Sequence, residues 1–149
     1  MVRFLLATAV VTALATACSG SSRPNADGEP GADAEGQVRA AAEGMIELIN
    51  ARRYGDMFDL FALECLEGIS RDQVAEDWKQ FAEQIGDPNF RLEITRFEVD
   101  SVSADRAEVT SQVVAHTTAR DIPMGGAEDP FFDVFIKQDG IWKSGDQSC

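Results

Sequence analysis

The spacing of apolar residues changes once along this chain, and Pro88 marks the change. Before Pro88, apolar side chains recur every three to four residues, which is the period of an amphipathic helix. After Pro88 they alternate with polar side chains, which is the period of a strand with one buried face. A chain with helices first and strands last is expected to form an α+β domain, with helices gathered on one face of an antiparallel sheet.

Three helices are predicted before Pro88. The first covers about 34–53 and the second about 56–63. The third has the clearest ends: Ser70 and Gln73 have the spacing of a capping box, and Gly86 stops the helix. The apolar stripe of the first helix is formed by Val38, Ala42, Met45, Ile46 and Ile49.

Three strands and a closing hairpin are predicted after Pro88. The first strand covers about 91–99, and its apolar residues change phase near Thr95 and Arg96, which indicates a bulge. The second covers about 106–118. A loop at 121–130 separates it from the third, at 131–138.

The pair Asp139-Gly140 predicts a two-residue hairpin turn, because a type I′ turn needs positive φ at both positions. This turn places Lys137 opposite Trp142 and Phe135 opposite Ser144. Both faces of the hairpin are then apolar, so one is expected to pack on the helices and the other to be covered by the C-terminal tail or another subunit. One face carries Phe131, Phe135 and Trp142, and the other carries Phe132, Val134, Ile136 and Ile141.

Residues 1–17 have the layout of an export signal peptide, with a positive charge at Arg3 and an apolar stretch over 4–14. The stretch is shorter than the roughly 20 residues that a membrane-spanning helix needs, so we expect it to be removed. Small residues then precede Cys18. Ala15-Thr16-Ala17 fits the ordinary small-x-small cleavage rule, which competes with a second cleavage site directly before Cys18.

Thr16-Ala17-Cys18 resembles the lipobox of bacterial lipoproteins, although Ala15 stands where that motif usually has Leu. The resemblance implies a diacylglyceryl thioether on Cys18, usually with a further acyl chain such as palmitate on its amine. Two or more acyl chains hold a protein firmly at a membrane. We therefore expect a lipid-anchored protein of the cell envelope, on the extracytoplasmic face of the cell membrane.

Three cysteines leave one thiol unexplained in an exported protein. Lipidation of Cys18 leaves Cys65 and Cys149, which are expected to form a disulfide in an oxidising compartment. Such a bridge would restrain the unfolded chain by about 4 to 5 kcal/mol in the chain-entropy model. The alternatives are a secreted soluble protein with a spare Cys18, and a chain in which Cys65 and Cys149 stay unpaired.

The 149 residues include 26 acidic and 13 basic side chains, a formal net charge of -13 at pH 7. Nucleic acid is therefore not expected as a partner, and anionic lipid would be repelled, so acyl chains must anchor the protein. After Cys18, residues up to 36 are rich in Gly, Ser, Pro and acidic residues, which is typical of a solvated spacer. The expected divisions are a signal peptide at 1–17, a lipidated spacer at 18–36 and one domain at 37–149.

The order of helices and strands, the junction Tyr54-Gly55-Asp56 and the closing Asp139-Gly140-Ile141-Trp142-Lys143 resemble the nuclear transport factor 2-like superfamily, which includes SnoaL-like domains. The resemblance implies a cone-shaped domain, with three helices packed on a curved antiparallel sheet of about four strands. It also implies a pocket between the sheet and the long helix, and often a homodimer through the sheet. Members include enzymes and proteins that only bind, so function depends on the site.

Enzymes of this superfamily commonly transfer protons with Asp, Tyr or His in an apolar pocket. The nearest candidates are Tyr54, Asp56, Asp59, Asp100 and His116. His116 lies on the polar face of its predicted strand, so an exposed or interface position is expected. Tyr54 and Asp56 are also explained by a helix end and an N-cap. These residues do not form a convincing catalytic set, so a non-catalytic protein is the leading expectation.

Metal and cofactor sites are not expected. One histidine and two paired cysteines cannot supply a zinc site. Asp121, Glu128, Asp129 and Asp133 lack the spacing of a known calcium loop, so an acidic surface loop is the simpler interpretation. The sequence also lacks the glycine-rich motifs that bind phosphate groups.

Three functions are compatible with these features. The leading one is a non-catalytic binding or scaffolding module of the cell envelope, which binds a protein partner or a second copy. The others are a carrier of a small apolar or lipidic ligand, and an isomerase- or dehydratase-like enzyme. The residues expected to line the pocket or an interface are Phe58, Trp78, Phe81, Phe97, Phe131, Phe135 and Trp142.

Overall fold

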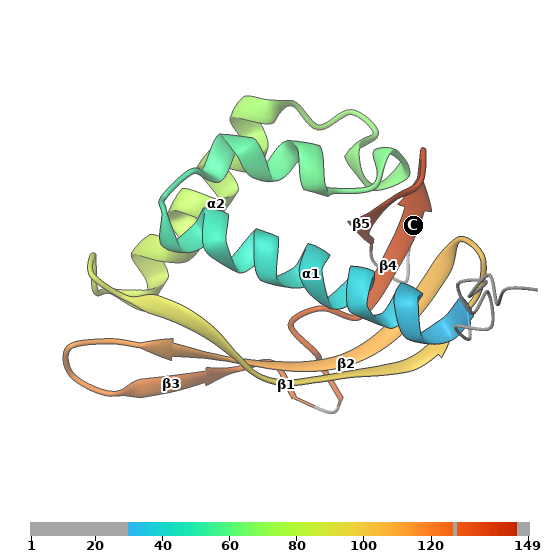
Figure 1. Cartoon of the computed structure of the whole chain (residues 1–149). Coiled ribbons are helices and arrows are strands. Elements are labelled where there is room, and N and C mark those ends of the chain that lie inside the picture. The colour runs from blue at the N-terminus through green and yellow to red at the C-terminus, as the bar shows by residue number, and fades with distance from the viewer. Residues whose placement is uncertain (1–29, 127, 146–149) are drawn as a thin grey trace, which may run out of the picture.

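The computed structural model describes residues 30–126 and 128–145, which form the α+β domain predicted from the sequence (Figure 1). The helical elements come first: α1 (Pro30–Asn50), the short 3₁₀ helices η1 (Tyr54–Leu60) and η2 (Leu63–Leu66), and α2 (Arg71–Ile85). The strands are β1 (Arg91–Val102), β2 (Arg106–His116), β3 (Asp121–Met124), β4 (Val134–Gln138) and β5 (Ile141–Gly145). The predicted signal peptide, Cys18 and Cys149 lie outside the described residues.

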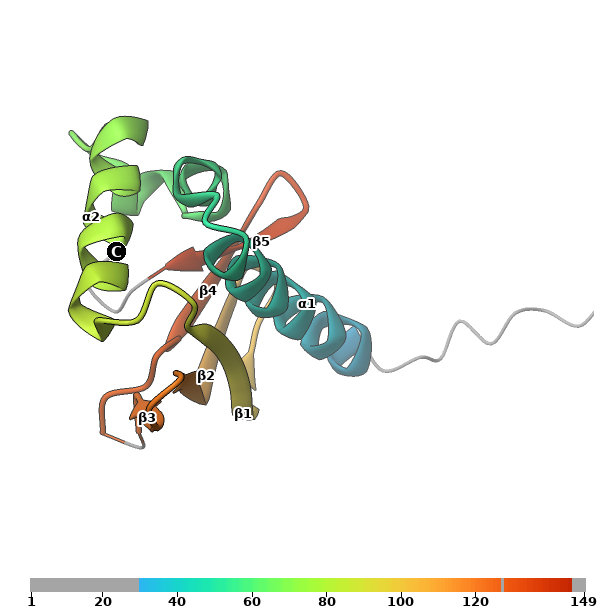
Figure 2. The same ribbon diagram turned by 90° about the vertical axis from the view of Figure 1, so that its left-hand side faces the viewer.

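The strands form one open antiparallel sheet in the order β1-β2-β4-β5, and β3 also pairs with β2. β1 pairs along the whole of β2. β3 and β4 share the other edge of β2, where β4 pairs with 106–108 and β3 with 113–116. All the helices lie on one side of this sheet, and the view in Figure 2 shows α1 crossing it.

The helix α1 begins at Pro30, inside the segment predicted to be a spacer, and ends at Asn50. Proline is well tolerated at the start of a helix, because its missing N–H would have no partner there. The predicted apolar stripe of α1 is confirmed, since all five of its residues are buried in the core: Val38, Ala42, Met45, Ile46 and Ile49.

The ends predicted for the third helix are confirmed by α2. The Ser70 hydroxyl accepts a hydrogen bond from the Gln73 N–H at 3.2 Å, and Gly86 ends the helix with a φ of 76°. The α-helix predicted at 56–63 is wrong in type. This segment forms the 3₁₀ helices η1 and η2, which are separated by the extended backbone of Phe61 and Ala62.

The bulge predicted near Thr95 and Arg96 is confirmed by a register shift between Ile94 and Arg96. A second shift between Val99 and Ser101 was not predicted. Bulges bend a strand and increase its twist, so these two let the long strand β1 curve beneath α1.

The predicted hairpin turn is also confirmed: φ is 52° at Asp139 and 81° at Gly140, and Lys137 pairs with Trp142. The predicted loop at 121–130 is wrong at its start, because 121–124 forms β3. The strand predicted from 131 begins only at Val134. The sheet therefore has five strands where about four were expected.

One face of the β4–β5 hairpin packs on the helices and carries Phe135, Trp142 and Ser144, all buried. The other face is buried at Val134 but leaves the Ile141 side chain 61% exposed. The sequence predicted that the C-terminal tail or another subunit covers this second face. The tail, residues 146–149, lies outside the described residues.

Candidate functional site

The space between α1 and the sheet is filled by side chains. Fully buried residues meet there from several elements: Met45 and Ile49 from α1, Met57 from η1, Leu92 from β1 and Phe135 from β4. Cavities lie at the margins of this core. Among the described residues, the centre of the space between α1 and the sheet is thus packed, and the cavities between them lie at its edges, beside the β4–β5 hairpin and beside β1.

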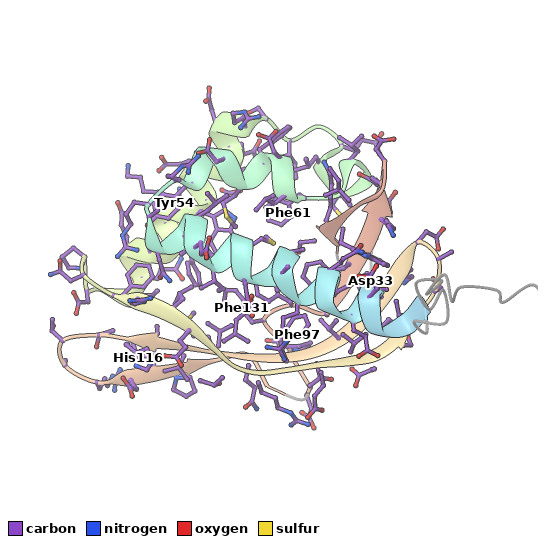
Figure 3. All side chains as sticks on the ribbon, in the orientation of Figure 1. Asp33, Tyr54, Phe61, Phe97, His116 and Phe131 are labelled. Atoms are coloured by element: carbon purple, nitrogen blue, oxygen red, sulfur yellow. The ribbon has the colours of Figure 1, made fainter. Side chains whose placement is uncertain are left out.

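Most of the aromatic residues predicted to line a pocket or an interface pack on one another. Phe131 lies 6.4 Å from Trp78 and 6.2 Å from Phe81 between ring centroids, so it joins the β3–β4 connection to α2. Phe97 and Phe135 lie 6.3 Å apart in an edge-to-face arrangement. Such aromatic pairs contribute about 0.5–1.5 kcal/mol each beyond their burial. Figure 3 shows Phe97 and Phe131 between α1 and the sheet.

Phe58 and Trp142 are each covered by a cation. The Arg71 guanidinium lies 5.1 Å from the Phe58 ring centroid, and the Lys137 ammonium lies 5.3 Å from that of Trp142. Phe58 is half-buried and Trp142 is buried. Phe58 therefore packs against the core, whereas Trp142 also lines a groove beside α1.

The catalytic candidates are not brought together. Tyr54 and Asp56 lie on η1, where Asp56 forms an ion pair with Arg53 at 2.6 Å. The expected N-cap role of Asp56 is wrong, because the residue at that position is Arg53 and no side chain caps η1.

Asp100 and His116 lie far apart on the sheet. Asp100 accepts a hydrogen bond from the Thr110 hydroxyl at 2.7 Å. His116 pairs with Arg91, nine residues away from Asp100 along β1, which is about 30 Å at roughly 3.3 Å per residue. Asp100 and His116 therefore do not belong to one active centre.

His116 joins three strands on the face of the sheet away from the helices. Its Nδ1 lies 2.8 Å from a carboxylate oxygen of Asp121 on β3, and its Nε2 lies 3.1 Å from one of Glu93 on β1. These two carboxylates, Asp121 first, raise the pKa of His116 above its usual value near 6.5. We call Glu93, His116 and Asp121 the histidine clasp.

A second cluster, which the sequence did not reveal, centres on Asp87 in the connection from α2 to β1. Asp87 is largely buried, and its carboxylate accepts hydrogen bonds from the Thr118 N–H at 2.6 Å, the Thr118 hydroxyl at 2.8 Å and the Asn89 N–H at 2.8 Å. These bonds, those from Thr118 first, hold the pKa of Asp87 below its usual value. In the sequence, Gly86 and Pro88 indicated only a helix stop at this point.

A groove lies between α1 and the β4–β5 hairpin, with a volume of about 350 Å³; we call it the hairpin groove. Small residues of α1 form one wall, so the hairpin does not fill the space beside the helix. The opposite wall includes Trp142, whose buried Nε1 has no hydrogen-bond partner within the described part of the chain. Its lining residues are Gln37, Ala40, Ala41, Gly44, Leu60, Gly140, Ile141 and Trp142.

Two large hydrophobic side chains stand exposed beside this groove. Ile141 lines it, and Leu63, 65% exposed, begins η2. The Leu63 N–H donates to the Gln138 side chain at 3.0 Å, and Gln138 pairs with Ile141 across the turn. Both exposed side chains therefore gather at the tip of the hairpin. Burying such a side chain contributes about 1.5–3 kcal/mol, so the pair offers a binding surface.

A smaller cavity of about 230 Å³ lies between η2 and α2, beside Cys65. Cys65 is disulfide-bonded. It is the single cysteine among residues 30–126 and 128–145, so its partner lies beyond them. Cys149, which also lies outside the described residues, remains the predicted partner. The lining is apolar except for Asp77: Phe61, Cys65, Leu66, Ile69, Val74, Asp77, Trp78 and Gly145.

Comparison with protein-family models and with curated proteins finds no match for this chain. Within the described residues, no group of three or more His, Cys, Asp or Glu side chains is arranged to hold a metal ion. None of the helices in that part of the chain is both long and apolar enough to cross a membrane.

Proposed function

We propose that this chain is an extracytoplasmic lipoprotein, anchored through Cys18, whose domain is a non-catalytic binding module of the cell envelope. The observation that carries the binding role is the hairpin groove, with exposed Leu63 and Ile141 at its end. Exposed apolar side chains that gather at one place are typical of a surface that another protein covers. The packed interior and the scattered acidic candidates argue against an enzyme.

The same proposal includes the fold family. The order of elements and the bent β1–β2 pair support a compact variant of the nuclear transport factor 2-like fold in which side chains occupy the usual pocket. A homodimer through the outer sheet face has less support, because that face carries exposed ion pairs such as Arg96 with Glu98 at 2.6 Å. Charged residues are depleted from the centres of protein interfaces.

Photo-crosslinking in intact cells tests the binding role. A photoreactive amino acid at position 141 should give one discrete protein adduct, whereas the same group at Asp72, exposed in the first turn of α2, should give none. Adducts of equal yield from both positions would contradict the proposal. An adduct with a second copy of the chain would identify the partner as the protein itself.

Two glycines of α1 provide a matched pair of variants. A Cβ at Gly44 or at Gly36 meets no atom within 4 Å, so a side chain can start in open space at both positions. Gly44 lines the groove and Gly36 does not. We expect Gly44→Leu to remove the adduct from position 141 and Gly36→Leu to keep it. Both variants should fold, because leucine favours a helix over glycine by up to about 1 kcal/mol.

The alternative function, a carrier of a small apolar ligand, is supported by the apolar cavity beside Cys65. Native mass spectrometry of the purified chain distinguishes the two. A bound lipid of defined mass that survives Gly44→Leu but is lost in Val74→Phe, which fills that cavity, would favour the carrier. A ligand-free protein that still forms the adduct favours the binding module.

A further inference from the structure

The histidine clasp has a geometry that only one protonation state of the ring satisfies. Both ring nitrogens of His116 face carboxylate oxygens, at 2.8 Å and 3.1 Å. Ionised carboxylates only accept hydrogen bonds, and a neutral imidazole has a single N–H to donate. A neutral ring would therefore point a lone pair at one of the two carboxylates, whereas an imidazolium donates to both.

The histidine clasp lies at the part of the sheet where the edge strand is shortest. β3 has only four residues and pairs with β2 alone, through Asp121 opposite His116, Pro123 opposite Val114 and their neighbours. The link from Glu93 through His116 to Asp121 is thus a connection of β3 to β1 across the full width of β2.

We propose that the β2–β3 hairpin is a pH-responsive element of this domain, fastened across three strands while His116 is an imidazolium and loosened when the ring loses its proton. This inference does not depend on the lipid anchor or on the hairpin groove. It assigns to the polar face of the sheet a regulatory role that is separate from partner binding.

The direction of the response follows from linkage. The pKa of His116 is raised in the folded chain, with Asp121 as the first cause. The stabilisation is therefore complete below the unfolded value near 6.5, and is lost as the pH rises through the folded value. Two cations also belong to this region: Arg91 is the Cα partner of His116 on β1, and Arg120 lies in the β2–β3 turn.

The Asp87 cluster holds the same hairpin with the opposite pH dependence. Asp87 binds Thr118 in the turn between β2 and β3, and the pKa of Asp87 is lowered. That attachment is lost as the pH falls. The β2–β3 hairpin is therefore held by both the histidine clasp and Asp87 only at pH values between the folded pKa of Asp87 and that of His116. When the pH rises above this range, the clasp is released while Asp87 still binds Thr118.

The segment that follows β3 connects the clasp to the rest of the domain. β3 leads through Gly126, which donates its N–H to the Asp129 carbonyl at 2.8 Å, to Phe131. Phe131 packs against Trp78 and Phe81 of α2. A change in β3 therefore reaches the aromatic contact between the sheet and α2.

Two measurements on the full chain test the proposal. The single histidine allows its pKa to be read directly from ring proton shifts in an NMR titration. Amide exchange of Ile122 and Met124, corrected for intrinsic base catalysis, reports the opening of β3 in the same pH range. For each unit by which the pKa of His116 exceeds its unfolded value, protection of these amides should fall about tenfold as the ring deprotonates.

The variants separate the clasp from general effects. His116→Gln should make the protection of β3 independent of pH between 6 and 9, and Glu93→Gln should reduce the pKa of His116 toward its usual value. Glu98→Gln, which removes an exposed carboxylate from the same strand, should behave like the natural chain. A titration of His116 at its unfolded value, or constant protection of β3 while the ring titrates, would overturn the proposal.

Discussion

Ser111 in β2 bridges both backbone groups of Phe132: its hydroxyl accepts from the Phe132 N–H at 2.7 Å and donates to the Phe132 carbonyl at 2.9 Å. Ser111 is fully buried. The side chain thus replaces a strand partner where the segment before β4 runs beside β2. This contact fixes Phe131 and Phe132 against α2 and the core.

Ser111→Ala leaves both groups of Phe132 buried without their partner. We expect the free energy of unfolding to decrease by about 1–3 kcal/mol, the cost of unsatisfied buried polar groups. Urea denaturation followed by tryptophan fluorescence measures this change. Ser101→Ala is the control, because the Ser101 hydroxyl is exposed, and its effect should stay within about 0.5 kcal/mol. Equal effects of the two variants would show that the bridge contributes nothing.

Asn50 at the end of α1 binds the backbone of Leu92 as a neighbouring strand would. Its carbonyl oxygen accepts from the Leu92 N–H at 2.7 Å, and its amide donates to the Leu92 carbonyl at 2.9 Å. Asn50→Asp places a carboxylate oxygen against that carbonyl. We expect a loss of about 1–3 kcal/mol at pH 7, which is reduced in acid when the carboxyl can donate.

Equilibrium unfolding at pH 7 and pH 4 measures the effect of Asn50→Asp. Gln84→Glu on α2 makes the same chemical change at an exposed position and is the control. The interpretation fails if Asn50→Asp destabilises the chain equally at both pH values.

Gly125 and Gly140 both have positive φ, 76° and 81°, but different surroundings. A Cβ at Gly140 meets nothing within 4 Å, whereas one at Gly125 would lie 2.5 Å from the backbone nitrogen of Phe131. Gly140→Ala should cost only the strain of a left-handed residue, about 1–2 kcal/mol. Gly125→Ala should cost distinctly more, since the backbone must move. Thermal unfolding of the two variants, compared side by side, tests this order, and a larger loss for Gly140→Ala would contradict it.

The lowered pKa of Asp87 indicates how the folding stability of the domain changes in acid. Because its folded pKa is lowered, the stability that it adds is complete above the unfolded aspartate value and is lost as the pH falls through the folded value. Asp87→Asn should therefore flatten the acid limb of the stability profile below the unfolded aspartate value, relative to the natural chain. Asp72→Asn, at an exposed carboxyl with no such bonds, should leave that limb unchanged. An identical acid limb in natural chain and Asp87→Asn would exclude this role.

Features held by neighbouring residues were predicted well from the sequence. The capping of α2 by Ser70 and the turn at Asp139-Gly140 depend on contacts within a few residues, so their spacing is visible in the chain. The bulge after Ile94 also left a signal, because it shifts the phase of apolar residues along one strand.

Features held by distant residues were missed. β3 contains Pro123 and only four residues, so nothing local marks it as a strand; it forms because the unoccupied edge of β2 accepts it. The bonds of Asp87 to Thr118 and of His116 to Glu93 join positions 31 and 23 residues apart. Such pairs depend on the register of the sheet, which the sequence of one strand does not specify.

The mass of the N-terminal peptide from the membrane fraction tests the central claim, the lipid anchor, most directly. A chain processed as proposed begins at Cys18, and its first tryptic peptide carries a diacylglyceryl thioether, usually with an additional acyl chain on the amine. Cys18→Ser should move the protein out of the membrane fraction, because that anchor depends on its acyl chains. An unmodified Cys18 in a chain recovered only from the medium, or a peptide that retains residues 1–17, would contradict the account.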